Sequence, residues 1–328
     1  MSGHRLVLVT GAAGFIGSHL VEALCARGDR VRAFIRYTSR NDRGWLEALP
    51  QSLNAQVEII AGDLKDADAV RGAVKGCEAV FHLGALIGIP YSYIHPRHYV
   101  ETNIVGTTNV LTAALDHQVR RVVTLSTSEV YGTAQYVPID ERHPHVGQSP
   151  YSASKIAADA LAESFHRSFG LPVTIIRPFN TYGPRQSLRA IIPTIIEQLQ
   201  AGSEVALGAT APTRDFTYVT DTVAGIIRAA EVDAAVGKSI NLGSGTEIAI
   251  GELAERIAQL LQKPLRLKSE AARLRPAESE VERLLANNAL ARQVLSWEPV
   301  VDLDDGLART IAWFKENPAA RRAHEYIV

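Results

Sequence analysis

The chain of 328 residues lacks the features of several specialised protein classes. Its only 2 cysteines, Cys25 and Cys77, are too few for a disulfide framework, and neither lies in the motif of a catalytic thiol. No apolar run approaches the roughly 20 residues that span a bilayer, and the N-terminus has no signal-peptide layout. Charge of one sign is not in excess, because 34 Lys and Arg residues face 35 Asp and Glu residues. We therefore expect a soluble, cytoplasmic protein that binds neither nucleic acid nor membranes.

The first half of the chain alternates continuous apolar runs with segments of helical spacing. Continuous runs are typical of strands buried on both faces, and their alternation with helices is typical of a parallel sheet. We therefore predict an α/β fold, a Rossmann-like doubly wound parallel sheet with helices on both faces. The predicted strands are 5–9, 31–36, 57–62, 79–85, 121–127 and 172–178, and the predicted helices are 17–28, 69–76, 102–118 and 152–170.

After about residue 178 the pattern changes, because Pro and Gly become frequent and short helices mix with short strands. We predict a main domain over 1–178 and a smaller, mixed α/β lobe mainly over 179–328. Segments near 215–245 look like elements that return to the main sheet.

The stretch VTGAAGFIGSHL places three glycines between a strand and a helix. Glycines there allow a tight turn and a close approach of the backbone to a pyrophosphate, and the helix N-terminus offers free N–H groups. A plain turn with packing glycines is the alternative, but the strand–turn–helix context favours dinucleotide binding by the main domain. We predict as cofactor-binding residues Gly11, Gly14, Phe15, Ile16, Gly17, Leu64 and Leu83.

The second predicted strand bears on the choice of cofactor. NAD sites usually have an acidic residue at its end, whereas this chain has Ile35 and Arg36. Arg36, with Arg40 nearby, could meet a 2′-phosphate, so we predict NADP, with NAD as the alternative. We expect Asp63 near the adenine amino group; its alternative role is a helix N-cap.

The stretch YSASK places Tyr151 and Lys155 four residues apart, on one helical face. The pKa of a free tyrosine is about 10, and a nearby ammonium favours the phenolate. Such a tyrosine can take a proton from an alcohol while hydride leaves the same carbon. Thr127, in the stretch LSTSEVYG, stands at the end of a predicted strand and can hydrogen-bond that alcohol.

The motifs TGAAGFIGSHL, STSEVYG, YSASK, RPFNTYGPRQ and TRDFTYVTD, in this order, resemble the extended short-chain dehydrogenase/reductase family of nucleotide-sugar epimerases, dehydratases and decarboxylases. The resemblance covers essentially the whole chain. It implies a tightly held nicotinamide, with Tyr151 as base, Lys155 as its activator and cofactor ligand, and Thr127 as the hydroxyl partner. It also implies a homodimer formed through the helices at 102–118 and 152–170.

The same resemblance implies that the second lobe binds a nucleotide-diphosphate sugar. Asn180 would contact phosphate and sugar, and Arg214 and Arg275 would grip the diphosphate, to which an arginine fork is suited. Each arginine could otherwise be structural. Tyr91 could form a wall of the sugar site, with packing as its alternative. His82, His95 and His98 lack acidic partners at metal-ligand spacing, so we expect no metal.

Glu129, two residues beyond Thr127, bears on the reaction. After oxidation at C4, an epimerase needs no further acid or base, whereas a 4,6-dehydratase needs a base for the C5 proton. Family dehydratases that act on neutral hexoses usually carry an aspartate, the acid for the leaving water, where this chain has Ser128. Serine is a poor general acid, and uronate decarboxylases also carry a Thr-Ser-Glu run.

The stretches LIGIPYSY, STSEVYGTA, RPFNTYGPRQSLRAIIPTII and RPAESEVERLL resemble one branch, the dehydratases that open the legionaminic acid pathway. This resemblance implies a 4,6-dehydratase acting on GDP- or UDP-N-acetylglucosamine. A C4 epimerase or a UDP-uronate decarboxylase is the alternative. A non-catalytic nucleotide-binding protein is a remote one, since Tyr151 and Lys155 are both present.

Overall fold

The computed structural model describes residues 5–40, 42–274 and 276–318. In this part of the chain, seven strands form one parallel sheet in the order β11-β6-β5-β4-β1-β2-β3. The strands are β1 (Leu6–Thr10), β2 (Arg30–Arg36), β3 (Val57–Gly62), β4 (Ala79–His82), β5 (Arg121–Leu125), β6 (Val173–Pro178) and β11 (Ser239–Leu242). The strand order reverses between β1 and β4, as in doubly wound dinucleotide-binding sheets. The predicted Rossmann-like fold is therefore confirmed.

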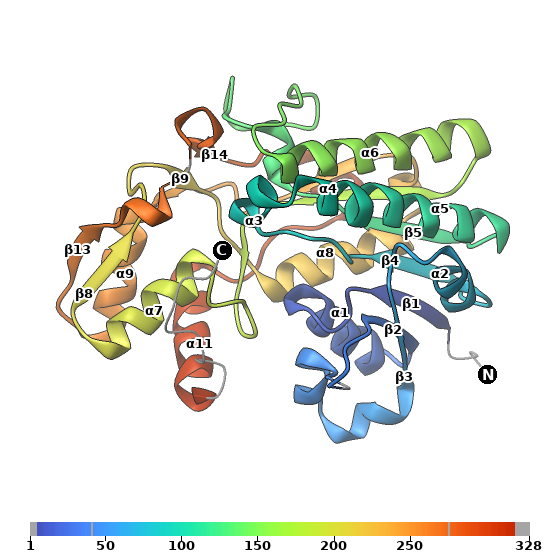
Figure 1. The fold of residues 1–328 in the computed structure, drawn as a ribbon, viewed down its shortest axis with the longest axis horizontal. Coiled ribbons are helices and arrows are strands. Elements are labelled where there is room, and N and C mark those ends of the chain that lie inside the picture. Colours follow the sequence, from blue (N-terminus) through green and yellow to red (C-terminus); the bar gives the residue numbers. More distant parts are fainter. Residues whose placement is uncertain (1–4, 41, 275, 319–328) are drawn as a thin grey trace.

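Helices cover both faces of this sheet (Figure 1). On one face α2 (Ala67–Val74), α5 (Gly106–Asp116) and α6 (Pro150–Phe169) pack side by side, and on the other α1 (Phe15–Ala26) packs against α8 (Val219–Glu231). In β1, Val7 and Val9 belong to one buried cluster and Leu8 to the other. Both faces of this strand are thus buried, which explains its continuous apolar run.

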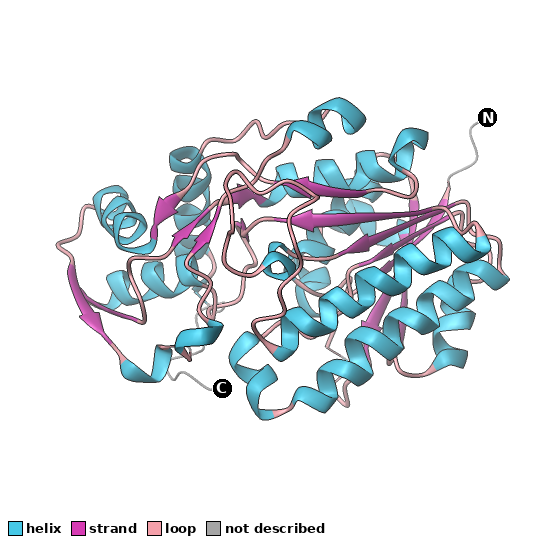
Figure 2. Cartoon of the chain, turned by 90° about the horizontal axis from the view of Figure 1, so that it is seen from above, coloured by secondary structure: helices cyan, strands magenta, loops and turns pink. Residues whose placement is uncertain are grey.

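The remaining strands form three small sheets, away from the N-terminus (Figures 1 and 2). These sheets pair β7 (Thr181–Tyr182) with β10 (Thr217–Tyr218), β8 (Glu204–Leu207) with β13 (Arg266–Ser269), and β9 (Thr213–Arg214) with both β12 (Ile248–Ala249) and β14 (Arg283–Leu284). The helices around them are α7 (Ile191–Ala201), α9 (Ile250–Leu261), α10 (Ala289–Leu295) and α11 (Leu303–Glu316).

The predicted helix over 102–118 differs from the observed segment. A short α3 (Ile89–Ile94) and α4 (Pro96–Tyr99) come first, and a π-helical turn, η3 (Val100–Val105), then leads into α5. Asn103 lies in the wide turn, and its side chain bonds the backbone N–H and the oxygen of Leu86 and the hydroxyl of Ser154. Hydrophobic spacing does not reveal an extra residue in a turn, so the sequence predicted a regular helix.

The two cysteines are buried and unpaired. Burial raises the pKa of both thiols to about 11, so neither is a ready nucleophile. Within the described residues, no helix has both the length and the apolar character needed to span a membrane.

Candidate active site

The glycine turn after β1 requires glycine for two different reasons. Gly11 has a φ of +69°, and a Cβ there would lie 2.8 Å from the backbone nitrogen of Gly84. A Cβ at Gly17 would overlap the backbone oxygen of Gly11. Gly14 is exposed and caps α1 without a side-chain hydrogen bond, so Phe15 and Ile16 open a helix with a bare N-terminus. This cradle of backbone atoms fits a pyrophosphate.

The other predicted cofactor residues lie at the same edge of the sheet. Arg36 is the exposed last residue of β2, and Leu83 follows β4. Leu64 lies against Gly84, since a Cβ on that glycine would lie 2.8 Å from Leu64 Cδ1. Asp63 accepts a hydrogen bond from the N–H of Lys65 at 3.0 Å.

Asp63 does not cap the helix that follows it. Asp66 fills that position, because its carboxylate accepts from the backbone N–H groups of Asp68 and Ala69. The structural alternative for Asp63, a helix N-cap, is therefore wrong.

The predicted catalytic residues come together where β5 ends beside α6. A capping box at Ser149 starts α6, which places Tyr151 in its first turn and Lys155 one turn further. Nζ of Lys155 donates to the backbone oxygen of Leu125 at 2.7 Å. Thr127 accepts a hydrogen bond from the N–H of Glu129 at 3.2 Å, so its hydroxyl proton remains available to Tyr151.

Burial dominates the electrostatics of this cluster. Burial raises the pKa of Tyr151, the hydrogen bond with Thr127 lowers it, and the nearby Glu129 carboxylate raises it. Burial also lowers the pKa of Lys155, and the Asp159 carboxylate acts in the opposite direction. The phenol is thus held protonated in this state, and any added positive charge beside it favours the phenolate.

Ser128 and Glu129 face different surroundings, although both lie in the short helical turn η4 (Ser128–Tyr131). Ser128 is buried, whereas Glu129 is partly exposed and close enough to act on the pKa of Tyr151. Of these two residues, Glu129 is therefore the one that combines partial exposure with a charge close to Tyr151.

Aromatic side chains cover Tyr151. The ring of Tyr99 meets that of Tyr151 edge-on with centroids 6.3 Å apart, and Tyr91 lies 6.1 Å from Tyr99. The Tyr99 hydroxyl donates to the backbone oxygen of Gly88 at 2.5 Å. Tyr91 thus connects to the predicted catalytic residue Tyr151 through Tyr99, a residue that the sequence did not single out.

Two of the predicted substrate residues lie close together in the second lobe. Nδ2 of Asn180 donates to the backbone oxygen of Asp215 at 3.3 Å, next to Arg214. Arg214 is buried and pairs with Glu280, Nη2 to Oε1 at 3.2 Å. Arg275 lies outside the described residues.

His82 has a structural role, since its two ring nitrogens bond side chains on neighbouring elements. Thr107 donates its hydroxyl proton to Asn103 O, so it must accept from Nε2 of His82, at 3.0 Å. Since Nε2 carries the proton of the neutral ring, Nδ1 is the acceptor, and the hydroxyl of Thr10 donates to it at 2.8 Å. The oxygen of Thr10 in turn accepts from the N–H of Gly84. Burial lowers the pKa of this imidazole to about 3, which leaves it neutral. Within the described residues, no group of His, Cys, Asp and Glu is arranged to hold a metal.

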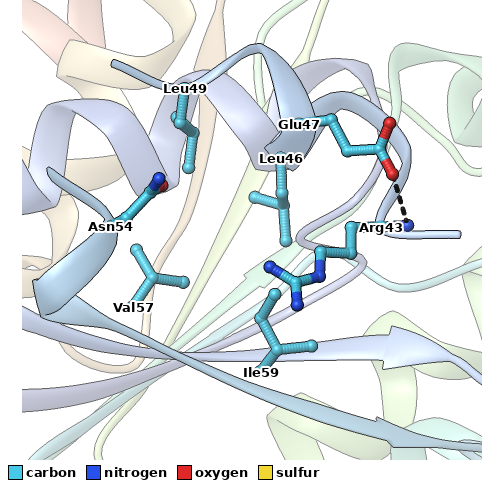
Figure 3. Close-up of a pocket in the computed structure, with 7 residues that line it drawn as sticks. All are labelled: Arg43, Leu46, Glu47, Leu49, Asn54, Val57 and Ile59. Atoms are coloured by element: carbon cyan, nitrogen blue, oxygen red, sulfur yellow. Dashed lines mark hydrogen bonds between the residues drawn. The ribbon is translucent and has the colours of Figure 1, made fainter. Parts of the chain in front are cut away.

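One cavity of about 280 Å³ lies apart from this cluster (Figure 3). The guanidinium of Arg43 points into it between Leu46 and Ile59. Its remaining lining residues are Glu47, Leu49, Asn54 and Val57. None of the predicted catalytic residues lines it, so it is not the site of the chemistry.

Comparison with known proteins identifies close matches over nearly the whole chain. Residues 8–310 match the model of the GDP-mannose 4,6-dehydratase family. A UDP-glucose 4-epimerase of Mycolicibacterium smegmatis is 35% identical, over 94% of this chain and 98% of its own. A dTDP-glucose 4,6-dehydratase of Actinoplanes sp. is 31% identical, over 95% and 98%. The solved dTDP-glucose 4,6-dehydratase of Streptomyces venezuelae, with NAD bound, is 31% identical and has a TM-score of 0.87 over 96% and 98% of the two chains.

Proposed function

Because this chain belongs to the GDP-mannose 4,6-dehydratase family, a family of nucleotide-sugar dehydratases and epimerases, we propose that it is a nucleotide-sugar 4,6-dehydratase. The proposed product is a 4-keto-6-deoxy sugar. The observation that carries the proposal is Glu129, a carboxylate that lies beside Tyr151 and beyond Thr127. An epimerase needs no such base, whereas elimination of water does.

The proposed chemistry begins at the C4 hydroxyl of the sugar. Thr127 orients this hydroxyl, and Tyr151 removes its proton with help from the Lys155 ammonium. When bound, a nicotinamide cofactor supplies the hydride acceptor at C4 and the hydride donor at C6. Between these two hydride transfers Glu129 takes the C5 proton, which the C4 ketone has made acidic, and it returns a proton to C5 when hydride adds at C6. Because serine is a poor general acid, we propose that the proton for the departing C6 hydroxyl comes from another group or from water.

The glycine cradle fits the pyrophosphate of such a cofactor, and we propose NADP over NAD. Support comes from the exposed Arg36 at the end of β2, where no acid stands to hold ribose hydroxyls. The Streptomyces venezuelae relative was solved with NAD, so NADP would be a departure. Denaturing the protein and identifying the released dinucleotide by mass tests this, and finding NAD alone would contradict it.

The proposed substrate is GDP- or UDP-N-acetylglucosamine. As the family resemblance implies, Arg214 and Asn180 would hold its diphosphate and Tyr91 would face its sugar. Arg275, outside the described residues, is proposed as a second diphosphate ligand. We also propose the division into a dinucleotide-binding domain and a nucleotide-sugar-binding lobe near residue 178.

A cytoplasmic homodimer is the proposed assembly. Its interface would lie on the outer side of α5 and α6. Large apolar side chains are exposed there and on the segments next to it, namely Ile94, Val100, Val105 and Phe169. Paired helices from two copies would bury this surface.

Product mass distinguishes the candidate reactions. Purified protein is incubated separately with GDP-N-acetylglucosamine, UDP-N-acetylglucosamine, dTDP-glucose and a UDP-uronate. Loss of one water supports the dehydratase. An unchanged mass with a new C4 configuration would identify a C4 epimerase, the second candidate, which the Mycolicibacterium relative favours. Loss of carbon dioxide would identify a decarboxylase.

A further inference from the structure

Three consecutive residues at the end of β5 are attached to α6 by side chains spaced four residues apart. The hydrogen-bonded pairs are Leu125–Lys155, Ser126–Asp159 and Thr127–Tyr151. Two of these pairs contain the proposed base and its activator. The third, Ser126–Asp159, contains no residue with a proposed role.

We propose that Asp159, held in place by Arg177, is a positioning residue that keeps the end of β5 aligned with α6 and keeps Lys155 protonated. The proposal rests on the assignment of Tyr151 and Lys155 as base and activator. Asp159 itself does not touch the reacting atoms.

The carboxylate of Asp159 is buried and hydrogen-bonded to two other segments of the chain. Asp159 is 3% exposed and Arg177 is 1% exposed. One oxygen, Oδ2, accepts from Ser126 Oγ at 2.8 Å and from Arg177 Nε at 3.0 Å. Arg177 in turn donates from Nη1 to the Tyr131 hydroxyl at 3.1 Å, and that hydroxyl donates to Asn241 Oδ1 at 2.7 Å. The carboxylate thus bonds directly to β6 and to Ser126 after β5, and through Arg177 and Tyr131 it is connected to β11.

Stability alone does not account for this arrangement. A buried ion pair is weak evidence for stability, because the desolvation of both charges offsets their attraction, and apolar residues of similar size often serve as well. An apolar residue at 159 would, however, release Ser126, the residue between Leu125 and Thr127. The position of the Thr127 hydroxyl relative to Tyr151 depends on that attachment.

The charge of Asp159 also acts on Lys155. Burial lowers the pKa of Lys155, and the carboxylate one turn along α6 raises it. His82 of β4 is also close enough to Lys155 for their charges to interact, but its imidazole is neutral. Asp159 itself is faced by Arg177 of β6, by His145, whose pKa burial lowers, and by Tyr151, whose pKa the Asp159 carboxylate raises. Asp159 is therefore the negative charge that favours the ammonium form of Lys155.

The first test needs no turnover. The ammonium of Lys155 is titrated by NMR in protein with isotope-labelled lysine, assigned with Lys155→Met. In Asp159→Asn the pKa of Lys155 is expected to fall by about one unit or more. Glu163→Gln, the same acid-to-amide change one turn further along α6, should leave it unchanged. An unchanged pKa in Asp159→Asn overturns the electrostatic part of the proposal, whatever reaction the protein catalyses.

Asp159→Asn leaves the Arg177 charge buried without its partner and is at risk of misfolding. The double variant Asp159→Asn/Arg177→Gln removes both charges, and since Asp159 is the charge that acts on Lys155, the same shift is expected. If the titration in the double variant matches wild type, the electrostatic part fails.

Ser126→Ala tests positioning, because it keeps the ion pair intact. We expect kcat to fall about tenfold with KM within about twofold of wild type, since only the alignment of Thr127 is disturbed.

In Asp159→Asn the alkaline limb of the pH profile of kcat should move to lower pH, and Asp159→Glu should restore the limb to its wild-type position. Wild-type kcat in Ser126→Ala would contradict the positioning part, and a uniform loss in Asp159→Asn without movement of the limb would contradict the electrostatic part. Both results together would leave Asp159 a merely structural residue. If wild-type protein turns over no sugar nucleotide, the proposed function fails, while the titration still decides the role of Asp159.

Discussion

Nζ of Lys155 donates a hydrogen bond to the backbone oxygen of Leu125 at 2.7 Å, which ties a buried ammonium to the end of the strand that leads into Thr127. Lys155→Met removes the charge and keeps an unbranched side chain of similar length. We expect kcat to fall by about 100-fold or more, because Tyr151 loses the charge that favours its phenolate. Steady-state assays measure this, with Lys75→Met, an exposed lysine, as the control. Wild-type turnover in Lys155→Met would remove the residue from the mechanism.

The glycine turn predicts different outcomes for two similar substitutions. Gly14 has a φ of −80°, and a Cβ there would meet only the backbone oxygen of Gly11, at 3.2 Å. Gly14→Ala should therefore fold with a Tm close to wild type but bind cofactor at least about tenfold more weakly, because the methyl group stands where the pyrophosphate approaches. Gly17→Ala should lower the Tm, since its Cβ overlaps Gly11. Thermal melts and dinucleotide titrations measure both, and equal cofactor affinity in Gly14→Ala would contradict the assignment of the turn.

Much of the fold could be predicted because local patterns determine it. Apolar runs marked the strands of the main sheet, and Gly170, with a φ of +69°, ends α6 where the sequence predicted. The four-residue spacing likewise placed Tyr151 and Lys155 on one helical face, although α6 begins at Pro150, two residues before the predicted start at 152.

Long-range partners could not be predicted from such patterns. Asp159 meets Arg177 and Ser126, and Arg214 meets Glu280, through folding that brings distant segments together. No local spacing links these residues. In the sequence, only the four-residue spacing from Lys155 to Asp159 indicated that Asp159 lies near the predicted site. That spacing is informative only because β5 lies beside α6 in the folded protein.

The pair Arg214–Glu280 predicts how substrate affinity is set. The carboxylate of Glu280 lies 3.2 Å from the Arg214 guanidinium, where it would compete with a substrate diphosphate. Glu280→Gln should lower KM for the nucleotide sugar by about fivefold, with kcat little changed. Glu282→Gln, an exposed acid on the same segment, is the matched control. A raised KM in Glu280→Gln would mean that Glu280 supports substrate binding instead.

His82 predicts a stability that falls in acid. Its pKa is about 3 in the folded protein and about 6.5 when unfolded, so between these values only the unfolded chain takes up the proton. The free energy of unfolding should therefore decrease as the pH falls below about 6.5, with this group contributing about 2 kcal/mol between pH ~6.5 and pH ~5. Urea unfolding at these two pH values measures the loss. His82→Gln should reduce it and His95→Gln, an exposed histidine, should not; an equal loss in His82→Gln would contradict the assignment.

The most direct test of the proposed reaction is the fate of substrate in Glu129→Gln. The amide cannot take the C5 proton, whereas Thr127, Tyr151 and Lys155 remain to orient and deprotonate the C4 hydroxyl, so that hydride can still leave C4. With the sugar nucleotide that wild-type protein dehydrates, we expect the variant to form reduced nicotinamide, seen by its absorbance, while water loss, seen by product mass, falls by about 100-fold or more. Dehydration at the wild-type rate in Glu129→Gln would contradict the account.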